Sequence, residues 1–150
     1  MSFKTRDKAI LRMTPEQRDE FLNEVRRLGV LATIRPDGFP QLTPLWYRWN
    51  GEAVIIWGGA ELGWVQNINA NPLVGFSVYE EHSPCPAVVM RGRASVENGQ
   101  SPRLEEEIRR IARRYLGDAD TVEAFATRWT ERQAMITVVP DKVVTWAAAG

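Results

Sequence analysis

The sequence has little cysteine and histidine, and this scarcity excludes several kinds of chemistry. Cys85 is the only cysteine among 150 residues, so the chain can form neither an internal disulfide nor a cysteine-based metal site. His82 is the only histidine, which leaves one candidate for a Ser-His-Asp triad. It lies in the polar residues 80–86, a segment typical of a solvated loop. We therefore expect no metal centre and no catalytic histidine.

Net charge and long apolar runs are also lacking. The 19 lysines and arginines balance 19 acidic residues, and three glutamates at 105–107 lie just before the arginine-rich residues 109–114. No basic stripe suggests nucleic acid. No apolar run approaches the roughly 20 residues that span a membrane, and the polar N-terminus does not resemble a signal peptide. We expect a cytoplasmic protein that binds neither nucleic acid nor membranes.

Lysine is scarce as well, whereas tryptophan is abundant. Lys4, Lys8 and Lys142 are the only lysines, and four of the six tryptophans fall between residues 46 and 64. The apolar and charged fractions, 44% and 25%, are ordinary for a globular protein. The length suits one domain spanning residues 1–150, in which we expect residues 1–13 to be a flexible N-terminal segment.

Helix and strand signals follow one another in an order typical of a mainly β protein with flanking helices. Thr14-Pro15-Glu16-Gln17 predicts a helix start with a capping box, and Gly29 suits its end. Ser101-Pro102 begins a second helix, which Gly117 ends. Shorter helices are predicted at residues 64–70 and 120–130. A meander of antiparallel strands is predicted at residues 30–34, 40–49, 53–57, 73–79, 87–96, 134–139 and 143–147.

The central strands are apolar on both faces. The two faces of residues 40–49 carry Leu42, Pro44 and Trp46, and Leu45, Tyr47 and Trp49, respectively. A sheet with one wet face would alternate apolar and polar side chains. Two compatible interpretations remain open: helices cover the outside of a closed barrel, or a second subunit or an aromatic ligand does.

Several short motifs occur in a characteristic order. Leu31 to Pro40, followed by Thr43-Pro44-Leu45-Trp46-Tyr47, could form two opening strands, and residues 67–74 a short helix that ends in Asn-Pro before a strand. Arg91-Gly92-Arg93-Ala94 leads into the next strand, and Val139-Pro140 and Thr145-Trp146 lie in the last ones. Together the motifs resemble the pyridoxamine 5'-phosphate oxidase-like split-barrel family over roughly residues 20 to 147.

This resemblance implies a six-stranded antiparallel split β-barrel, a homodimer, and a cofactor held between the two subunits. The cofactor is FMN in one branch and a deazaflavin coenzyme in another, while further branches bind haem or tetrapyrroles. The resemblance also implies roles for residues. The residues expected beside the cofactor ring are Thr43, Pro44, Leu45 and Trp46. The residues expected to shape the phosphate or tail region are Gly58, Gly59, Trp64 and Asn67. We expect the partner's Trp146 to complete the mouth of the groove.

The sequence departs from the family pattern in the phosphate region. Gly58 stands where Ser or Thr is usual, and Gly63-Trp64 where Arg-Lys commonly holds the phosphate. Backbone N–H groups of Gly58, Gly59 and the short helix could replace those donors, as could Arg48 or an arginine of the second subunit. In the alternative interpretation, Trp64 packs in the core or an interface and the phosphate site is degenerate.

These features predict an FMN- or deazaflavin-dependent oxidoreductase that passes a hydride between the ring and a small organic substrate. No residue stands out as an obligatory catalyst, as expected where the cofactor carries the chemistry. One alternative is a non-catalytic barrel that sequesters a flavin, haem or another planar ligand. Another is a dimeric barrel that has lost its ligand.

Overall fold

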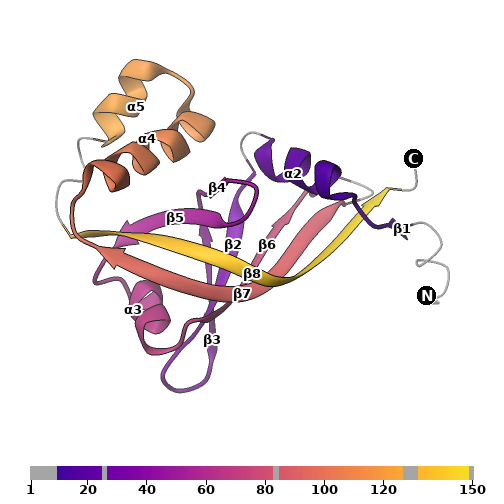
Figure 1. The fold of residues 1–150 in the computed structure, drawn as a ribbon, viewed down its shortest axis with the longest axis horizontal. Helices are drawn as coiled ribbons and strands as arrows, with labels where there is room; N and C mark the ends of the chain where they lie inside the picture. The colour runs from indigo at the N-terminus through magenta and orange to yellow at the C-terminus, as the bar shows by residue number, and fades with distance from the viewer. Residues whose placement is uncertain (1–9, 25–26, 83–84, 127–131, 149–150) are drawn as a thin grey trace.

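One antiparallel sheet organises the chain (Figure 1). The computed structural model describes residues 10–24, 27–82, 85–126 and 132–148. Its strands are β1 (Ile10–Leu11), β2 (Gly29–Ile34), β3 (Pro40–Leu45), β4 (Arg48–Trp49), β5 (Val54–Gly59), β6 (Leu73–Tyr79), β7 (Ala87–Asn98) and β8 (Gln133–Ala148). Six are long and β1 and β4 have two residues each, so the predicted mainly β split barrel is confirmed with two short additions.

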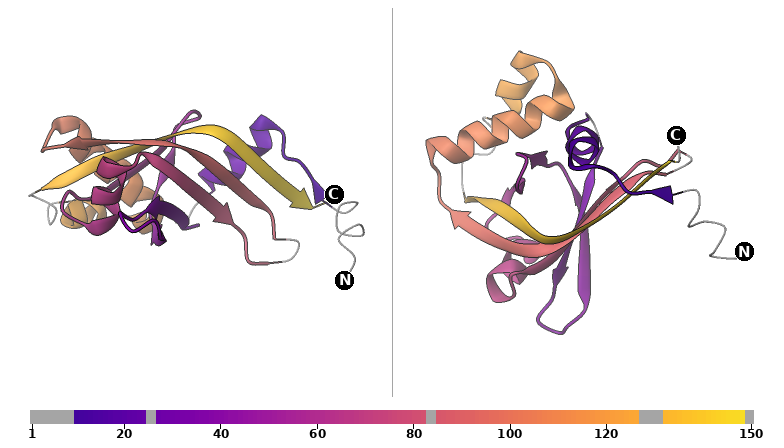
Figure 2. Two further views of the ribbon diagram at one scale, coloured as in Figure 1. Left: turned by 90° about the horizontal axis from the view of Figure 1, so that it is seen from below. Right: turned by 45° about the vertical axis from the view of Figure 1, so that its right-hand side comes forward.

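The order of strands across the sheet is β3-β2-β6-β7-β8-β5-β4, and β1 also pairs with β8. Its two edge strands, β3 and β4, are separated in the sequence only by Trp46 and Tyr47. The sheet must therefore curl until its edges meet, and the right-hand view of Figure 2 shows this curvature. The prediction of a single strand over residues 40–49 is therefore wrong. The chain passes from one edge of the sheet to the other at Trp46 and Tyr47, which divides this segment into β3 and β4.

The longest pairing joins β7 to β8, from Ala87 opposite Trp146 to Asn98 opposite Ala134. The register shifts once, where Arg91 faces Lys142 and Gly92 faces Pro140. This bulge absorbs the proline, which cannot donate a backbone hydrogen bond to a ladder. The prediction of two closing strands on either side of Pro140 is therefore wrong, since β8 runs through it as one strand.

Local end signals account for most helix boundaries. Helix α2 (Pro15–Asn23) starts with the predicted capping box, in which Thr14 Oγ1 accepts from the Gln17 N–H and Gln17 Oε1 accepts from the Thr14 N–H. Helix α4 (Pro102–Leu116) starts after Ser101 and ends at Gly117, as predicted. Helices α3 (Gly63–Ala70) and α5 (Ala119–Ala126) match the two short predictions, apart from the part of the latter at 127–130, which lies outside the described residues.

Gly29 does not end the first helix, which contradicts the prediction. Helix α2 already ends at Asn23, and Gly29 is the first residue of β2. The ring of Phe76 on β6 lies against it, so a Cβ at position 29 would come within 2.5 Å of Phe76 Cε2. A glycine is needed there for close packing between strands rather than for a helix end.

Two apolar clusters hold the fold together. The inner one fills the curl of the sheet and includes Leu22, Tyr47, Ile56 and Trp64. The outer one lies between the sheet and α4 and contains Ala53, Ile55, Leu104, Ile108, Ile111 and Met135. Both faces of β5 are therefore buried, as expected if helices cover the outside of the barrel. On β3, by contrast, Leu42 stays 67% exposed in the single chain.

Part of the N-terminal segment is held by the last strand. Residues 1–9 lie outside the described residues. Ile10 and Leu11 pair with Ala148 and Ala147, and the Met13 N–H donates to Thr145 Oγ1 at 2.9 Å. Within the described residues, no helix has the length and hydropathy needed to cross a membrane.

Replacing Gly92 with alanine should strongly destabilise the protein. A Cβ at this position would collide with the Val139 carbonyl oxygen and lie 2.8 Å from Pro140 Cα, and backbone cannot yield as a side chain does. We expect Gly92→Ala to lower the free energy of unfolding by about 3 kcal/mol or more in urea denaturation. Gly75→Ala is the matched control, because its Cβ would meet Ala32 Cβ at an ordinary 3.6 Å. Equal stability of the two variants would contradict this account.

The buried phenol of Tyr47 should make stability fall at high pH. Burial raises the pKa of Tyr47 and also that of Tyr115. Above pH 10 the unfolded chain loses tyrosine protons that the folded chain keeps, so the free energy of unfolding declines as the pH rises. We expect Tyr47→Phe to reduce this decline by about 1.4 kcal/mol in total between pH 9 and 11, measured by urea denaturation. Parallel curves for wild type and variant would refute the assignment.

Candidate functional site

A groove of about 520 Å³ opens where the ends of β3 and β5 approach α3 and α5. It brings together seven of the nine residues that the sequence predicts to bind a cofactor: Thr43, Pro44, Leu45, Trp46, Gly58, Gly59 and Trp64. The remaining lining residues are Leu28, Trp57, Leu62, Phe125 and Gln133. The two strands meet here because the curled sheet brings its edges together. Residues separated by more than ten positions in the sequence thus share one surface.

Aromatic rings form one wall of the groove. The rings of Trp46 and Phe125 have centroids 5.2 Å apart, and Trp57 meets both edge-on at 6.2 and 6.0 Å. Behind this wall Tyr115 stacks on Trp46 at 4.9 Å with the planes 5° apart. The Tyr115 hydroxyl donates to the Arg27 carbonyl at 2.7 Å. Trp46 is therefore held in one orientation by a ring that is itself anchored to the backbone.

Trp64 and Gly58 form the other wall as a pair. The six-membered ring of Trp64, in the first turn of α3, lies directly over Gly58 of β5. A Cβ at position 58 would collide with this ring and lie 2.8 Å from Trp64 Cη2. The Trp64 side chain is buried among the inner apolar cluster. Trp64 therefore packs in the core, as the alternative interpretation of its role predicted, and it also lines the groove.

The groove carries no charged side chain among the lining residues that the structure describes. Thr43 and Gln133 supply its polar side chains. Arg48, one of the possible phosphate donors, is not among the residues that line the groove. Its guanidinium makes two hydrogen bonds to Glu107 on α4, at 2.9 and 2.7 Å, and both side chains are largely buried. Its charge is thus already paired.

Backbone donors remain at the start of α3. Leu62 occupies the N-cap position with no side-chain hydrogen bond, and its own carbonyl accepts from the Val65 and Gln66 N–H groups. The first N–H groups of a helix have no partner within the helix. The N-terminus of α3 therefore offers the partial positive charge that the lining side chains do not provide.

The other two predicted residues lie outside the groove. Asn67 is buried, and its amide donates to Thr33 Oγ1 at 3.1 Å and to Gln41 Oε1 at 3.0 Å, which ties α3 to β2 and β3. Trp146 lies near the far end of β8, opposite Ala87 on β7, and its indole N–H donates to the Cys85 carbonyl. The role expected for Trp146 involves a partner subunit and stays a prediction.

Sequence reasoning missed several residues that line the groove. Trp57 carried a local signal, because it directly precedes Gly58 in an aromatic-rich stretch. Phe125 carried none, since α5 reaches the groove only through the way α4 and α5 pack on the sheet. Gln133 likewise enters only because β8 pairs with β5 at Gly59.

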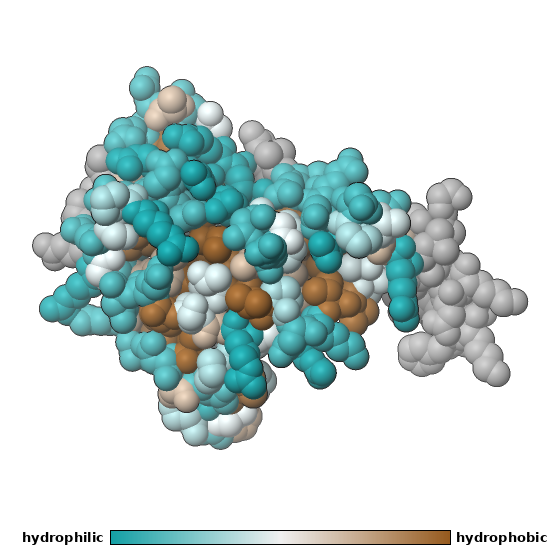
Figure 3. All heavy atoms as spheres, viewed as in Figure 1, coloured by the Kyte–Doolittle hydropathy of each residue, from teal (hydrophilic) through white to brown (hydrophobic). Residues whose placement is uncertain are grey.

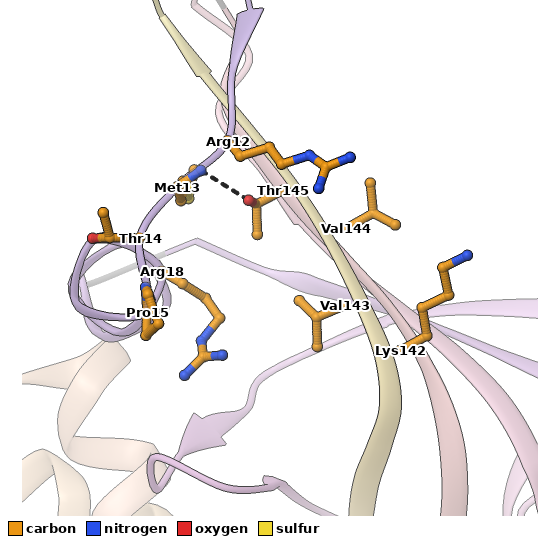
Figure 4. Close-up of a pocket in the computed structure, with 9 residues that line it drawn as sticks. All are labelled: Arg12, Met13, Thr14, Pro15, Arg18, Lys142, Val143, Val144 and Thr145. Atoms are coloured by element: carbon orange, nitrogen blue, oxygen red, sulfur yellow. Dashed lines mark hydrogen bonds between the residues drawn. The ribbon is translucent and has the colours of Figure 1, made fainter.

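A second hollow, of about 270 Å³, lies between α2 and β8 (Figure 4). Three cationic side chains border it, those of Arg12, Arg18 and Lys142. Arg18 is paired with Asp19 at 2.9 Å, and Lys142 projects from the opposite side of β8 to Val143 (Figure 4). None of the predicted site residues lines this hollow. The groove beside β3 and β5 is therefore the candidate functional site.

Comparison with known proteins supports the fold described above. The sequence pattern of the pyridoxamine 5'-phosphate oxidase family matches residues 13–147. The chain belongs to this family. The predicted family assignment is thus confirmed over nearly the whole domain. No curated protein matches the sequence significantly.

Solved structures share the fold. A conserved hypothetical protein from Mycobacterium tuberculosis is 24% identical, with a TM-score of 0.77 over 89% of this chain and 84% of its own. An F420 reductase is 29% identical, with a TM-score of 0.65 over 83% and 94%. The haem-storage protein HutZ from Vibrio cholerae is 17% identical, with a TM-score of 0.70 over 92% and 97%. One fold therefore serves both a reductase and a storage protein.

Proposed function

We propose that the groove binds the planar ring of a flavin or deazaflavin cofactor. The protein would then be an oxidoreductase that passes a hydride between this ring and a small organic substrate. The observation that carries the proposal is the meeting of Thr43–Trp46 and Gly58–Gly59 in one apolar groove with an aromatic wall. Its volume of about 520 Å³ lies within the range of small-molecule and cofactor sites.

The residues of the groove suit a flat aromatic ring better than a charged tail. Trp46, Trp57 and Phe125 offer ring edges and faces for stacking, and Thr43 and Gln133 offer polar atoms that can orient the ring by hydrogen bonds. For a phosphate, the described lining residues offer only uncharged donors: the side chains of Thr43 and Gln133, and backbone N–H groups such as those at the start of α3. FMN, bound through its ring, is the cofactor we propose, with a deazaflavin coenzyme as the alternative.

The chain's part in the reaction is to bind and orient. A bound flavin or deazaflavin would itself accept or donate the hydride, so the protein needs no nucleophile of its own. The Trp46 wall, fixed by Tyr115, would hold the ring in one plane and keep water from it. The open side of the groove leaves space for a substrate beside the ring.

A second candidate is a non-catalytic site for a planar ligand such as a flavin or haem. It is favoured by the absence of titratable side chains among the described lining residues, since none of them can transfer a proton. The two candidates differ in one respect. An enzyme must let a small donor reduce the bound ring and a small acceptor reoxidise it, whereas a storage module need not.

Titration with FMN and with the deazaflavin tests the proposal. We expect one of them to bind with a shifted visible spectrum and quenched tryptophan fluorescence, and to be reduced by a small donor and reoxidised by a quinone. Trp46→Ala should weaken binding about tenfold, because it removes one aromatic contact. Trp49→Phe is the control, since Trp49 lies outside the groove and donates to Asp19. Absence of binding at high micromolar concentrations would refute the cofactor proposal.

We also propose that the protein is a homodimer formed through the outer face of the sheet. The strand register places Pro44, Val30, Ser77, Val89 and Val144 in one row across five strands. Apolar side chains on this face stay exposed in the single chain: Leu42, Leu73, Val89, Val139 and Val144. Apolar patches also interrupt the polar surface over the sheet in Figure 3. Exposed apolar side chains gathered on one face of a sheet are typical of a subunit interface.

Placing a charge on this face should separate the subunits. We expect wild-type protein to have the mass of a dimer in light scattering at micromolar concentration, and Leu42→Glu to have that of a monomer, because a carboxylate would be buried without a partner. Arg103→Glu, on the exposed surface of α4, serves as control and should stay dimeric. A monomeric wild-type protein would refute the proposal.

A further inference from the structure

The Gly58–Trp64 pair decides what can sit at its end of the groove. The indole occupies the space into which any side chain at position 58 would extend, so the two residues depend on one another. Trp64 is only 8% exposed and packs with the inner cluster. Moving the indole out of this position would expose the inner cluster to water, so this wall is part of the folded core.

The surroundings of this pair are apolar and uncharged. Leu28 and Leu62 border the groove, and each is about half exposed, at 49% and 50%. The nearby guanidinium of Arg48 is taken by Glu107. The cationic side chains around the second hollow, those of Arg12, Arg18 and Lys142, are not among the residues that line the groove.

An anionic group placed against this wall would lose hydration and gain little in return. Phosphate oxygens are bound most strongly by charged donors such as Arg and Lys. Here the described donors are the side chains of Thr43 and Gln133 and the backbone N–H groups at the start of α3. None carries a full charge, and the helix dipole is worth only a fraction of one. An uncharged, partly apolar substituent loses less hydration and gains contact with the indole.

We infer that the groove selects its ligand by the aromatic ring and an uncharged substituent, and that a phosphate adds nothing to affinity. Trp64 seated over Gly58 is the specificity-determining pair. This inference rests on the proposed binding of a flavin-type ring in the same groove, and it names which form of that ring the site accepts.

Riboflavin and FMN form the probe pair, because they differ only in the phosphate. Measured by flavin fluorescence at equal ionic strength, riboflavin should bind wild-type protein at least as tightly as FMN, within about threefold. Tenfold or greater preference for FMN would overturn the inference. This comparison needs no variant and so does not depend on the folding of one.

Variants then test whether the pair is responsible. Trp64→Lys combined with Gly58→Ser introduces an ammonium and a hydroxyl, and should shift the affinity ratio toward FMN by tenfold or more. Trp64→Phe keeps an apolar ring and should leave the ratio unchanged, with circular dichroism reporting the fold of both. An unchanged ratio in a folded double variant would overturn the role of the pair.

Failure of the cofactor proposal has a separate outcome. If neither flavin binds, the cofactor proposal fails, and 2-naphthol and 2-naphthyl phosphate then test the groove by quenching of tryptophan fluorescence. Tighter binding of 2-naphthol supports the inference, and this preference should be lost in the Trp64→Lys, Gly58→Ser variant. Tighter binding of the phosphate, or no binding of either probe, overturns it.

Discussion

The two-residue link between β3 and β4 is the constraint on which this structure depends. Trp46 and Tyr47 join the opposite edges of one sheet, so the sheet can exist only in a curled form. Tyr47 is fully buried, and its hydroxyl donates to the Leu22 carbonyl at 2.7 Å. Trp46 turns the other way and becomes the aromatic wall of the groove. The residues that close the barrel therefore also create the candidate site.

The helices between β7 and β8 complete the groove that the link between β3 and β4 begins to form. Helix α4 covers the outer face of β5 and supplies Tyr115, which stacks on Trp46, while α5 supplies Phe125. Helix α4 also carries Glu107, which pairs with the Arg48 guanidinium. A largely buried carboxylate of this kind needs a cation, so the charge of Arg48 is neutralised within this pair. Helices α4 and α5 thus add aromatic rings to the groove, and Glu107 on α4 neutralises the positive charge of Arg48.

For the ligand proposed here, solvation would decide affinity more than attraction between charges. The fold of this chain is shared by an F420 reductase and a haem-storage protein. In this chain the rings of Trp46, Trp57 and Trp64 line the groove, and its described side chains carry no charge. Stacking and exclusion of water are the forces that remain, and they favour flat, weakly hydrated molecules.

The sequence by itself determined the features that depend on neighbouring residues. The capping box at Thr14 and the stop at Gly117 act within one helical turn, and the order of the strand motifs was enough to indicate the family and most of the groove. Only the tertiary structure decided the break at Trp46–Tyr47, the unbroken course of β8 past Pro140, and the seating of Trp64 over Gly58. These depend on contacts between segments far apart in the chain, where strand pairing and available space override local preference.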